Sequence, residues 1–392
     1  MILPGATLGM LGGGQLGRMF TLRARAMGYR VVVLDPDPDS PAGQAANSHI
    51  HAGYDDPVAL DRLAHECAVI STEFENIPAQ VLEHLAERVP VRPSAASVEV
   101  AQDRITEKSF LRDHGFATAE FRAVASAKGA ALALVEIGAP ALLKTSRLGY
   151  DGKGQAKVTS AAEVEAAFTK FGGVPCILEQ LVPLDLEVSV VLARGLDGAI
   201  QAYPPGENVH RNGILHTTTV PARISPALAD EARRVASTVA EKLGYVGVLG
   251  VELFVSGGKV LVNEIAPRPH NSGHWTQDAA TTDQFEQQVR AMCGLPLGSP
   301  ALMTPVAMVN ILGDAWTHGE PDWATVLETP GVVLHLYGKK EPRPGRKMGH
   351  IAALAGTAEE AERIVRSARE AAGRAGESPA PPNPNCKTTR QV

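Results

Sequence analysis

The sequence of 392 residues lacks the features that mark several protein classes. Its four cysteines, Cys67, Cys176, Cys293 and Cys386, lie far apart without a CxxC pair, which argues against a disulfide framework or zinc knuckle and favours a reducing compartment. No run approaches the roughly 18 apolar residues of a membrane span. The first residues also lack the basic segment of a secretory signal. We therefore expect a cytoplasmic protein without a membrane partner.

A surplus of basic residues is also missing. Lys and Arg number 37 against 43 Asp and Glu, a net charge of −6, so nucleic acid is not expected as a partner. Neither a Gly-x-Ser-x-Gly elbow nor an HExxH motif occurs, so covalent nucleophilic catalysis has no specific support. What the chain does have is 44% hydrophobic residues, enough for a large core, and a length typical of two or three domains.

Over the first hundred residues, short apolar runs alternate with helical patterns, which is typical of a parallel sheet covered on both faces. The expected strands are 7–11, 30–35, 69–71 and one near Val91. The expected helices are one that ends at Met27, one at 58–67 and one at 79–88.

The rest of the chain predicts an α+β arrangement, in which Gly-containing turns join antiparallel strands. In the middle, the expected strands are 141–144, 176–179, 187–192, 214–220, 248–255 and 259–264, and the expected helices are 226–243 and 281–293. A third segment begins near Pro305, and its expected elements are strands at 306–312 and 332–337 and a helix at 358–372. The proline-rich stretch 378–384 is expected to be a disordered tail.

Residues 12–17, Gly-Gly-Gly-Gln-Leu-Gly, fit the GxGxxG pattern between a strand and a helix, and Asp35 ends the next strand. Such a turn lets the backbone approach an anion, and the helix N-terminus supplies free N–H groups. The pattern leaves three interpretations open: a nicotinamide dinucleotide, the phosphate or ribose of a substrate, and simple packing of helix on strand.

A second glycine-rich segment follows the strand that contains Lys144. Residues 149–154, Gly-Tyr-Asp-Gly-Lys-Gly, interleave three glycines with charged side chains, as in a mobile loop that cradles an anion. The segment is not a Walker A motif, because GxxxxGK[ST] is missing. An ordinary hairpin turn with solvated charges is the alternative.

Glu252, Asn263 and Glu264 supply hard oxygen ligands of the kind that suits Mg²⁺ carried by nucleotide phosphates. They lie on two strands joined at residues 257–258. A two-residue turn would place Glu252 opposite Asn263 and Glu264 on the other face, whereas a three-residue loop would place both carboxylates on one face. The metal interpretation needs the longer loop or a bulge, and two solvated edge carboxylates are the alternative.

A loop stiffened by proline and glycine, residues 267–276, carries many polar side chains and is a candidate for substrate recognition. His270 and His274 have the spacing of zinc ligands on a helix, but Pro269 and Gly273 argue against a helix there.

Residues 337–347 hold five cations within nine residues on another stiffened loop. This favours a phosphate clamp over a solvated charge run. Glu73 and Glu75 follow the strand that ends at Ser71, at the carboxyl edge where α/β sheets bind ligands.

Together and in this order, these segments resemble the ATP-grasp superfamily, and more closely its family of 5-(carboxyamino)imidazole ribonucleotide synthases. The resemblance extends to about residue 355. Its most specific stretches are HNSGHWT at 270–276 and RPGRKMGH at 343–350. Others are GGQLGRM at 13–19, DRITEK at 103–108, GYDGKGQ at 149–155, GYVGV at 244–248 and NEIAPR at 263–268.

The resemblance implies an α/β and α+β protein with the ATP-grasp fold in three parts. These are a parallel-sheet preATP-grasp domain at 1–103, an ATP-grasp domain with its lid at 104–300, and a small C-terminal domain at 301–375, followed by a tail at 376–392. It also implies a homodimer.

The resemblance further implies a nucleotide site with Mg²⁺ bound by Glu252 and Glu264, beside Asn263. The residues implied for ATP are Arg104, Lys144, Gly149, Tyr150, Asp151, Gly152, Lys153, Gly154, Gln155, Glu179, Gln180, Leu181, Val182, Glu187, His210, Asn263 and Glu264. Among them, residues 179–182 are implied to form the hinge that binds adenine. Lys153 stands where the family usually has arginine, which keeps the charge but loses the bidentate fork.

For 5-aminoimidazole ribonucleotide, the implied set is Gln15, Leu16, Glu75, Tyr150, Asp151, Lys153, Arg268, His270, Asn271, Ser272, Lys339, Arg346 and Lys347. Asp151 is the candidate base for the exocyclic amine, and Lys339 the candidate that holds the intermediate. Lys340 is an alternative to Lys339, because this loop can slip by one residue.

The implied reaction is the ATP-dependent carboxylation of this ribonucleotide with bicarbonate, through carboxyphosphate, to give 5-(carboxyamino)imidazole ribonucleotide, ADP and phosphate in de novo purine biosynthesis. Another purine ATP-grasp ligase, such as formate-dependent glycinamide ribonucleotide transformylase, is the nearest alternative. A nicotinamide-dependent dehydrogenase is a distant one, because only the glycine turn and Asp35 support it.

Overall fold

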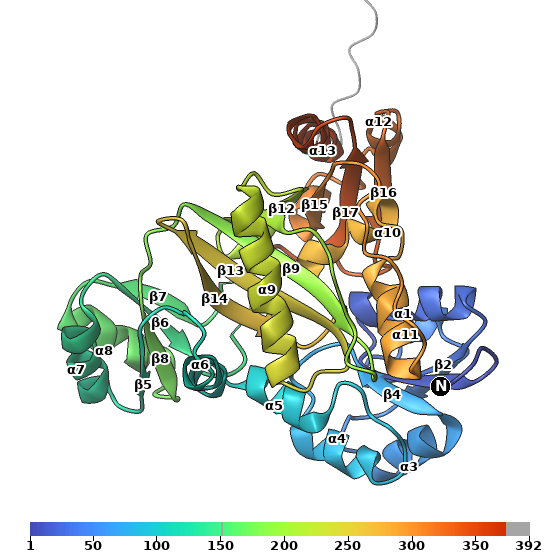
Figure 1. Cartoon of the computed structure of the whole chain (residues 1–392), viewed down its shortest axis with the longest axis horizontal. Coiled ribbons are helices and arrows are strands. Elements are labelled where there is room, and N and C mark those ends of the chain that lie inside the picture. Colours follow the sequence, from blue (N-terminus) through green and yellow to red (C-terminus); the bar gives the residue numbers. More distant parts are fainter. Residues whose placement is uncertain (150–151, 374–392) are drawn as a thin grey trace, which may run out of the picture.

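The computed structural model describes residues 1–149 and 152–373, and Figure 1 shows the arrangement of their helices and strands. Their named strands form three sheets: a parallel one, a small antiparallel one and a large antiparallel one. Within these described ranges, no helix has both the length and the apolar character needed to cross a bilayer. The fold is the mixed α/β and α+β arrangement that the sequence predicts.

The N-terminal sheet is parallel and has the strand order β3-β2-β1-β4. Its elements are β1 (Thr7–Leu11), β2 (Arg30–Asp35), β3 (Ser48–His51), β4 (Val69–Thr72) and the helices α1 (Gln15–Ala26), α2 (Pro41–Ala45), α3 (Pro57–Glu66), α4 (Ala79–Ala86) and α5 (Ala95–Gln102). The apolar runs are buried, as expected for a sheet covered on both faces. The strand expected near Val91 is only a single bridge to Ile70.

The small sheet has the order β5-β8-β6-β7 and carries two helices on one face (Figure 1). Its elements are β5 (Phe121–Val124), β6 (Ala141–Thr145), β7 (Gln155–Val158), β8 (Cys176–Gln180), α7 (Ala127–Ile137) and α8 (Ala161–Lys170). Helix α6 (Arg104–Asp113) precedes this sheet. The second glycine-rich segment joins β6 to β7 and is therefore the connection of a β-hairpin.

The large sheet has the order β14-β13-β9-β11-β12-β15-β17-β16, with β10 beside β9. Its strands are β9 (Leu186–Arg194), β10 (Ile200–Ala202), β11 (Gly206–Arg211), β12 (Ile214–Val220), β13 (Gly247–Ser256), β14 (Lys259–Ala266), β15 (Val306–Leu312), β16 (Val332–Leu336) and β17 (Lys347–Leu354). Because β12 pairs with β15, the C-terminal strands extend the central sheet.

Helices cover both faces of the large sheet. They are α9 (Pro226–Lys242), α10 (Thr276–Ala279), α11 (Gln284–Cys293), α12 (Trp323–Leu327) and α13 (Ala358–Ala372), with the 3₁₀ turns η1 (Asn271–Gly273) and η2 (Gly313–Trp316). Helix α9 lies across β13 and β9 (Figure 1). Helix α11 packs against α1, and its Gln288 bonds to the Val248 N–H and the Ser71 hydroxyl. This helix therefore ties the parallel sheet to the large sheet.

Several boundaries differ from the sequence expectation. The helix expected from residue 281 begins at Gln284, because the Asp283 side chain accepts hydrogen bonds from the N–H groups of Phe285 and Glu286. The cationic loop was expected to include Lys347, but Lys347 is the first residue of β17. Strand β11 and helices α5 to α8 were not expected, because their short apolar patterns are weak.

Candidate active site

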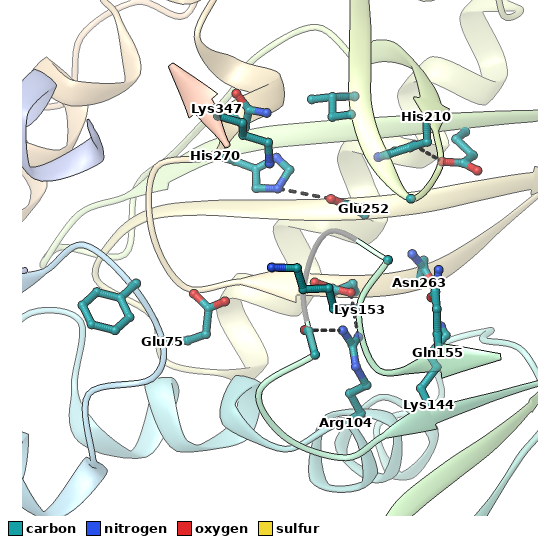
Figure 2. Close-up of a pocket in the computed structure, with 18 of the residues that line it drawn as sticks. Glu75, Arg104, Lys144, Lys153, Gln155, His210, Glu252, Asn263, His270 and Lys347 are labelled. Atoms are coloured by element: carbon teal, nitrogen blue, oxygen red, sulfur yellow. Dashed lines mark hydrogen bonds and ion pairs between the residues drawn. The ribbon is translucent and has the colours of Figure 1, made fainter. Parts of the chain in front are cut away.

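A cavity of about 530 Å³ opens where the three sheets meet (Figure 2). This volume is in the range of small-molecule sites. The small sheet supplies Lys144 and the segment after it, the large sheet supplies Glu252 and Glu264, and the N-terminal sheet supplies Glu75. The cavity therefore draws on all three regions of the chain.

Two carboxylates stand opposite each other on β13 and β14. Ser256 pairs with Lys259, so the turn has two residues, yet Glu252 pairs with Glu264 because Asn263 is an extra residue in a bulge. Both carboxylates line the cavity. A bulge is thus what brings them to one face, and it was one of the two geometries that the metal interpretation allowed.

Each carboxylate has a basic side chain beside it. Glu252 Oε1 lies 3.2 Å from His270 Nε2, and Glu264 Oε2 lies 2.8 Å from Arg104 Nη1 (Figure 2). Burial alone would raise the pKa of Glu252, but the bond from His270 and nearby positive charges lower it to about 2. The charge of Glu264 raises the pKa of Arg104. The site therefore holds two carboxyl groups on one face, and the pKa of Glu252 is held low, which suits a divalent cation.

Lys144 lines the cavity and forms a buried ion pair with Glu179, with 2.7 Å between Nζ and Oε2. Burial would raise the pKa of Glu179, but the charges of Lys144 and Lys108 lower it. Glu179 is not among the cavity-lining residues. Its side chain therefore fixes Lys144 in place.

The hinge expected at residues 179–182 contributes one cavity-lining side chain, Leu181. The N–H groups of Gln180 and Leu181 donate to the carbonyl oxygens of Glu120 and Pro140. Gln180 and Val182 are not among the lining residues. An adenine bound at this hinge would have to bond to backbone groups of the hinge other than these two N–H groups.

The glycine-rich loop borders the cavity through Gly149, Gly152, Lys153 and Gln155. The Gly149 carbonyl accepts a bond of 2.9 Å from Arg104 Nη2, so this arginine bridges the loop and Glu264. Tyr150 and Asp151 lie outside the described residues.

One loop glycine is required by its surroundings. Gly154 does not line the cavity, has a φ of +69° and would place a Cβ 2.6 Å from Thr145 Oγ1. A side chain at this position would strain the backbone and collide with Thr145.

On the cavity wall, Glu187 and His210 form an ion pair with 2.5 Å between Oε2 and Nδ1. Burial would lower the pKa of His210, but the bond to Glu187 raises it. Apolar side chains also line the cavity, and the strand register sets Leu215 beside His210 and Phe254 beside Glu187. The sequence could not reveal these apolar lining residues, because strand residues of this kind also fill cores. They are Leu142, Leu184, Leu215 and Phe254.

The far end of the cavity collects most of the residues expected for the ribonucleotide. The lining there includes Gln15, Leu16, Glu75, Arg268, His270, Asn271 and Lys347. Arg268 Nε lies 2.7 Å from Glu75 Oε2. Burial would raise the pKa of Glu75, but Arg268 lowers it. Ser272 is behind the wall, where its hydroxyl bonds to Ser189 and to His270 Nδ1.

The cationic loop separates into different environments. Lys339 does not line the cavity, but its Nζ donates to the Gln15 Oε1 and, at 2.8 Å, to the Lys347 carbonyl. Lys340 lies at the surface, where its Nζ is 2.6 Å from Asp39 Oδ2. Arg346 donates to the Glu341 carbonyl and is not part of the wall.

The glycine turn before α1 already donates N–H groups to carboxylates of the protein itself. Glu73 accepts bonds of 2.5 Å from the Gly14 N–H and 2.6 Å from the Gly17 N–H, and Asp35 accepts one from Gly13. These N–H groups are the ones that a dinucleotide would need, so the turn offers no support for a nicotinamide site. Glu73 lines the cavity, and its place after β4 was the only sequence signal for it.

His274 lies apart from His270. Its ring is fully buried near His350, with 5.1 Å between the ring centroids, whereas His270 faces Glu252. The two side chains therefore have different partners, Glu252 for His270 and His350 for His274.

Three family models match the chain in sequence order. They describe a ribonucleotide synthetase preATP-grasp domain (residues 5–102), an ATP-grasp domain (109–285) and a phosphoribosylaminoimidazole carboxylase C-terminal domain (306–364). The chain is similar to the N5-carboxyaminoimidazole ribonucleotide synthases of Brucella melitensis, 46% identical over 90% of this chain and 97% of the relative, and of Bacillus subtilis, 42% identical over 92% and 94%.

Solved structures show the same likeness. An N5-carboxyaminoimidazole ribonucleotide synthetase in complex with ADP has a TM-score of 0.90 at 43% identity, covering 94% of this chain and 97% of the other. An Aspergillus clavatus N5-carboxyaminoimidazole synthase with ADP and 5-aminoimidazole ribonucleotide has a TM-score of 0.87 at 31% identity, covering 94% and 99%.

Proposed function

This chain belongs to the N5-carboxyaminoimidazole ribonucleotide synthase family of ATP-grasp ligases, and we propose that the cavity between its three sheets is where ATP and bicarbonate carboxylate 5-aminoimidazole ribonucleotide. The reaction gives 5-(carboxyamino)imidazole ribonucleotide, ADP and phosphate in purine biosynthesis. The observation that supports this site best is the bulge that sets Glu252 opposite Glu264 in a cavity also lined by Lys144.

We assign the nucleotide to the end of the cavity between the small and large sheets. Lys144, Arg104 and Lys153 would neutralise its phosphates, and Glu187 with His210 would face the ribose. The apolar side chains beside that pair suit the flat face of adenine. Of the residues expected for ATP, those that line the cavity support this assignment, and Glu179 lies behind them. The lining residues are Arg104, Lys144, Gly149, Gly152, Lys153, Gln155, Leu181, Glu187, His210, Asn263 and Glu264.

The residues present fit Mg²⁺. Glu252 and Glu264 present their carboxyl groups on one face, and each has one oxygen close to a basic side chain, His270 or Arg104. Asn263, in the bulge between them, adds an amide oxygen to the same wall. When bound, Mg²⁺ would neutralise phosphate charge during phosphoryl transfer.

Bicarbonate requires activation because its carbon has no good leaving group. Phosphorylation by ATP produces carboxyphosphate, which water destroys readily, so the site must exclude water while the amine attacks. The loop at 149–155 borders the cavity and bonds to Arg104, which suits a lid that closes over bound nucleotide.

We assign the ribonucleotide to the end lined by Gln15, Arg268 and Lys347, where cationic groups suit its phosphate. Asp151 remains our candidate base for the exocyclic amine, on sequence grounds. Lys339 is our choice over Lys340 for the lysine that holds the intermediate, because Lys339 bonds to Gln15 whereas Lys340 pairs with Asp39 at the surface.

The decisive assay follows ADP release with ATP, bicarbonate and 5-aminoimidazole ribonucleotide, omitting bicarbonate and the ribonucleotide in turn. We expect full release to require both. Release that instead needs formate and glycinamide ribonucleotide would identify the transformylase alternative. Release with ATP alone would contradict the assigned substrates.

Three further properties are expected on the family likeness: a homodimer, a cytoplasmic location, and the domain division at residues 103 and 300. Sedimentation equilibrium of the purified chain tests the first. A single species at the 41.3 kDa monomer mass would contradict it.

A further inference from the structure

A cluster of four polar side chains, two buried and two partly exposed, lies behind the ribonucleotide end of the cavity. Asp278 lies on α10, His335 on β16 and His350 on β17. Tyr337 is the residue that directly follows β16. None of the four is among the residues that line the cavity. The cluster therefore joins the C-terminal strands to the short helix that follows the substrate loop.

The contacts in the cluster form a chain. His335 Nε2 lies 3.0 and 3.1 Å from the two oxygens of Asp278. The rings of His335 and His350 are stacked, with 4.5 Å between centroids and 13° between planes. His350 Nδ1 lies 3.0 Å from the hydroxyl of Tyr337. Each side chain is thus oriented by the next.

The inner members of this chain are inaccessible to water. His350 is 0% exposed and Tyr337 is 1% exposed. Burial holds the pKa of His350 well below its usual value and raises that of Tyr337, so both side chains are neutral. Two neutral, buried groups that share a hydrogen bond have few alternative partners, and this holds the hydroxyl end of Tyr337 in place.

The chain ends at Lys339. Its Nζ lies 5.7 Å from the centroid of the Tyr337 ring, within the range of a cation–π contact. The same ammonium donates to the Lys347 carbonyl and to Gln15, which lines the cavity. A tilt of the Tyr337 ring would therefore move the ammonium relative to Gln15.

A metal does not explain this cluster. Ligand atoms of Asp278, His335 and His350 lie within 4.8 Å of one another, close enough to suggest an ion. The two rings are nearly parallel, however, so their in-plane lone pairs run side by side and do not converge on one point. His335 Nε2 is also already bonded to the carboxylate.

We propose that Asp278, His335 and His350 are positioning residues that act through Tyr337 to set Lys339 for binding 5-aminoimidazole ribonucleotide. The inference rests on the proposed function, because it concerns the substrate at that end of the cavity. It assigns a task to His350 and its stacked partner His335, which lie on the two strands that flank the cationic loop and do not line the cavity.

A double-mutant cycle tests the proposal. His335→Ala removes the stack and should raise the KM for the ribonucleotide about tenfold, while the KM for ATP stays within twofold. Lys339→Met should raise the same KM further. The double variant should equal Lys339→Met alone within twofold, because the stack acts only through that lysine.

Two variants complete the test. His335→Phe keeps a ring that can stack and should recover most of the wild-type KM. Lys340→Met removes a neighbouring surface charge and should leave both KM values unchanged. If His335→Ala does not fold, Asp278→Asn takes its place in the cycle, with an expected rise in KM of about threefold.

The results distinguish a failure of the positioning role from a failure of the proposed function. Additive effects in the cycle, an equal rise in the KM for ATP, or an unchanged KM in the folded variants would each overturn the positioning role. Wild-type protein whose ADP release does not depend on the ribonucleotide would instead overturn the proposed function.

Discussion

The two ends of the cavity are built in different ways. At the nucleotide end, Lys144, Glu252 and Glu264 stand on strands, and the strand register with its bulge places them. At the ribonucleotide end, Gln15, Arg268 and Lys339 come from remote parts of the chain and meet through loops and helix ends. Groups on strands should tolerate changes around them, whereas groups on loops depend on the side chains that pack behind them.

The largest effect is expected for Asp151, the proposed base, which serves the reaction that joins the contents of the two ends. Asp151→Ala should lower carboxylation about a thousandfold, because a positioned base is lost, and should leave ADP affinity within a few fold. Steady-state assays and ADP titration measure the two quantities. Asp197→Ala, in an exposed turn, is a matched control with no expected effect. A fully active Asp151 variant would contradict the assignment.

The strand-borne end is tested by Lys144→Met. We expect kcat/KM for ATP to fall about a hundredfold, because a cation that faces the phosphates is removed. The variant also leaves Glu179 buried without its partner, which should lower the free energy of unfolding by about 3 kcal/mol.

A second substitution separates these two losses. Adding Glu179→Gln should restore much of the stability, measured by urea unfolding, without restoring activity. Recovery of both would show that Lys144 serves only the fold.

Arg268→Gln tests the loop-borne end. The KM for the ribonucleotide should rise about thirtyfold, since a buried guanidinium beside Glu75 is lost, while the KM for ATP changes less than threefold. Arg112→Gln, an exposed arginine, controls for the change in net charge. Equal changes in both KM values would mean that the two ends of the cavity are not separate.

The smallest effect is expected away from both ends, at Glu207. Burial would raise its pKa, but hydrogen bonds from Arg223 lower it below 4.5, so the ionised form adds stability above pH 4.5 that is lost as the pH falls through the lowered value. Glu207→Gln should cost about 2 kcal/mol at pH 7, with activity unchanged.

The pH dependence is the check on this prediction. Urea unfolding of both proteins should give free energies that converge as the pH falls below 4.5. A constant difference at all pH values would mean that the carboxylate charge contributes nothing.

Much of the site was predictable because its residues belong to short motifs whose residue types and spacing indicate their chemistry. The carboxylates, the glycine-rich loop and the loop at 267–276 all fall on one cavity. Glu73 shows why the rest was not: as a single carboxylate after a strand, it has no motif, and only folding brings it to the N–H groups of Gly14 and Gly17.

Register is the other quantity that the sequence left open. Counting along the strands allowed Glu252 to face Asn263 or to share a face with Glu264, and the bulge decided between them. A bulge depends on pairing with neighbouring strands, so no local pattern specifies it. Likewise, Lys339 and Lys340 are equivalent as adjacent residues, but one packs over Tyr337 and the other reaches Asp39 at the surface.

By itself, then, the sequence determined which chemical groups this protein possesses and the family of folds that presents them, because residue type and spacing are local properties. Only the tertiary structure decided which groups face one another. That choice depends on register, packing and burial, which arise when segments far apart in the chain come into contact.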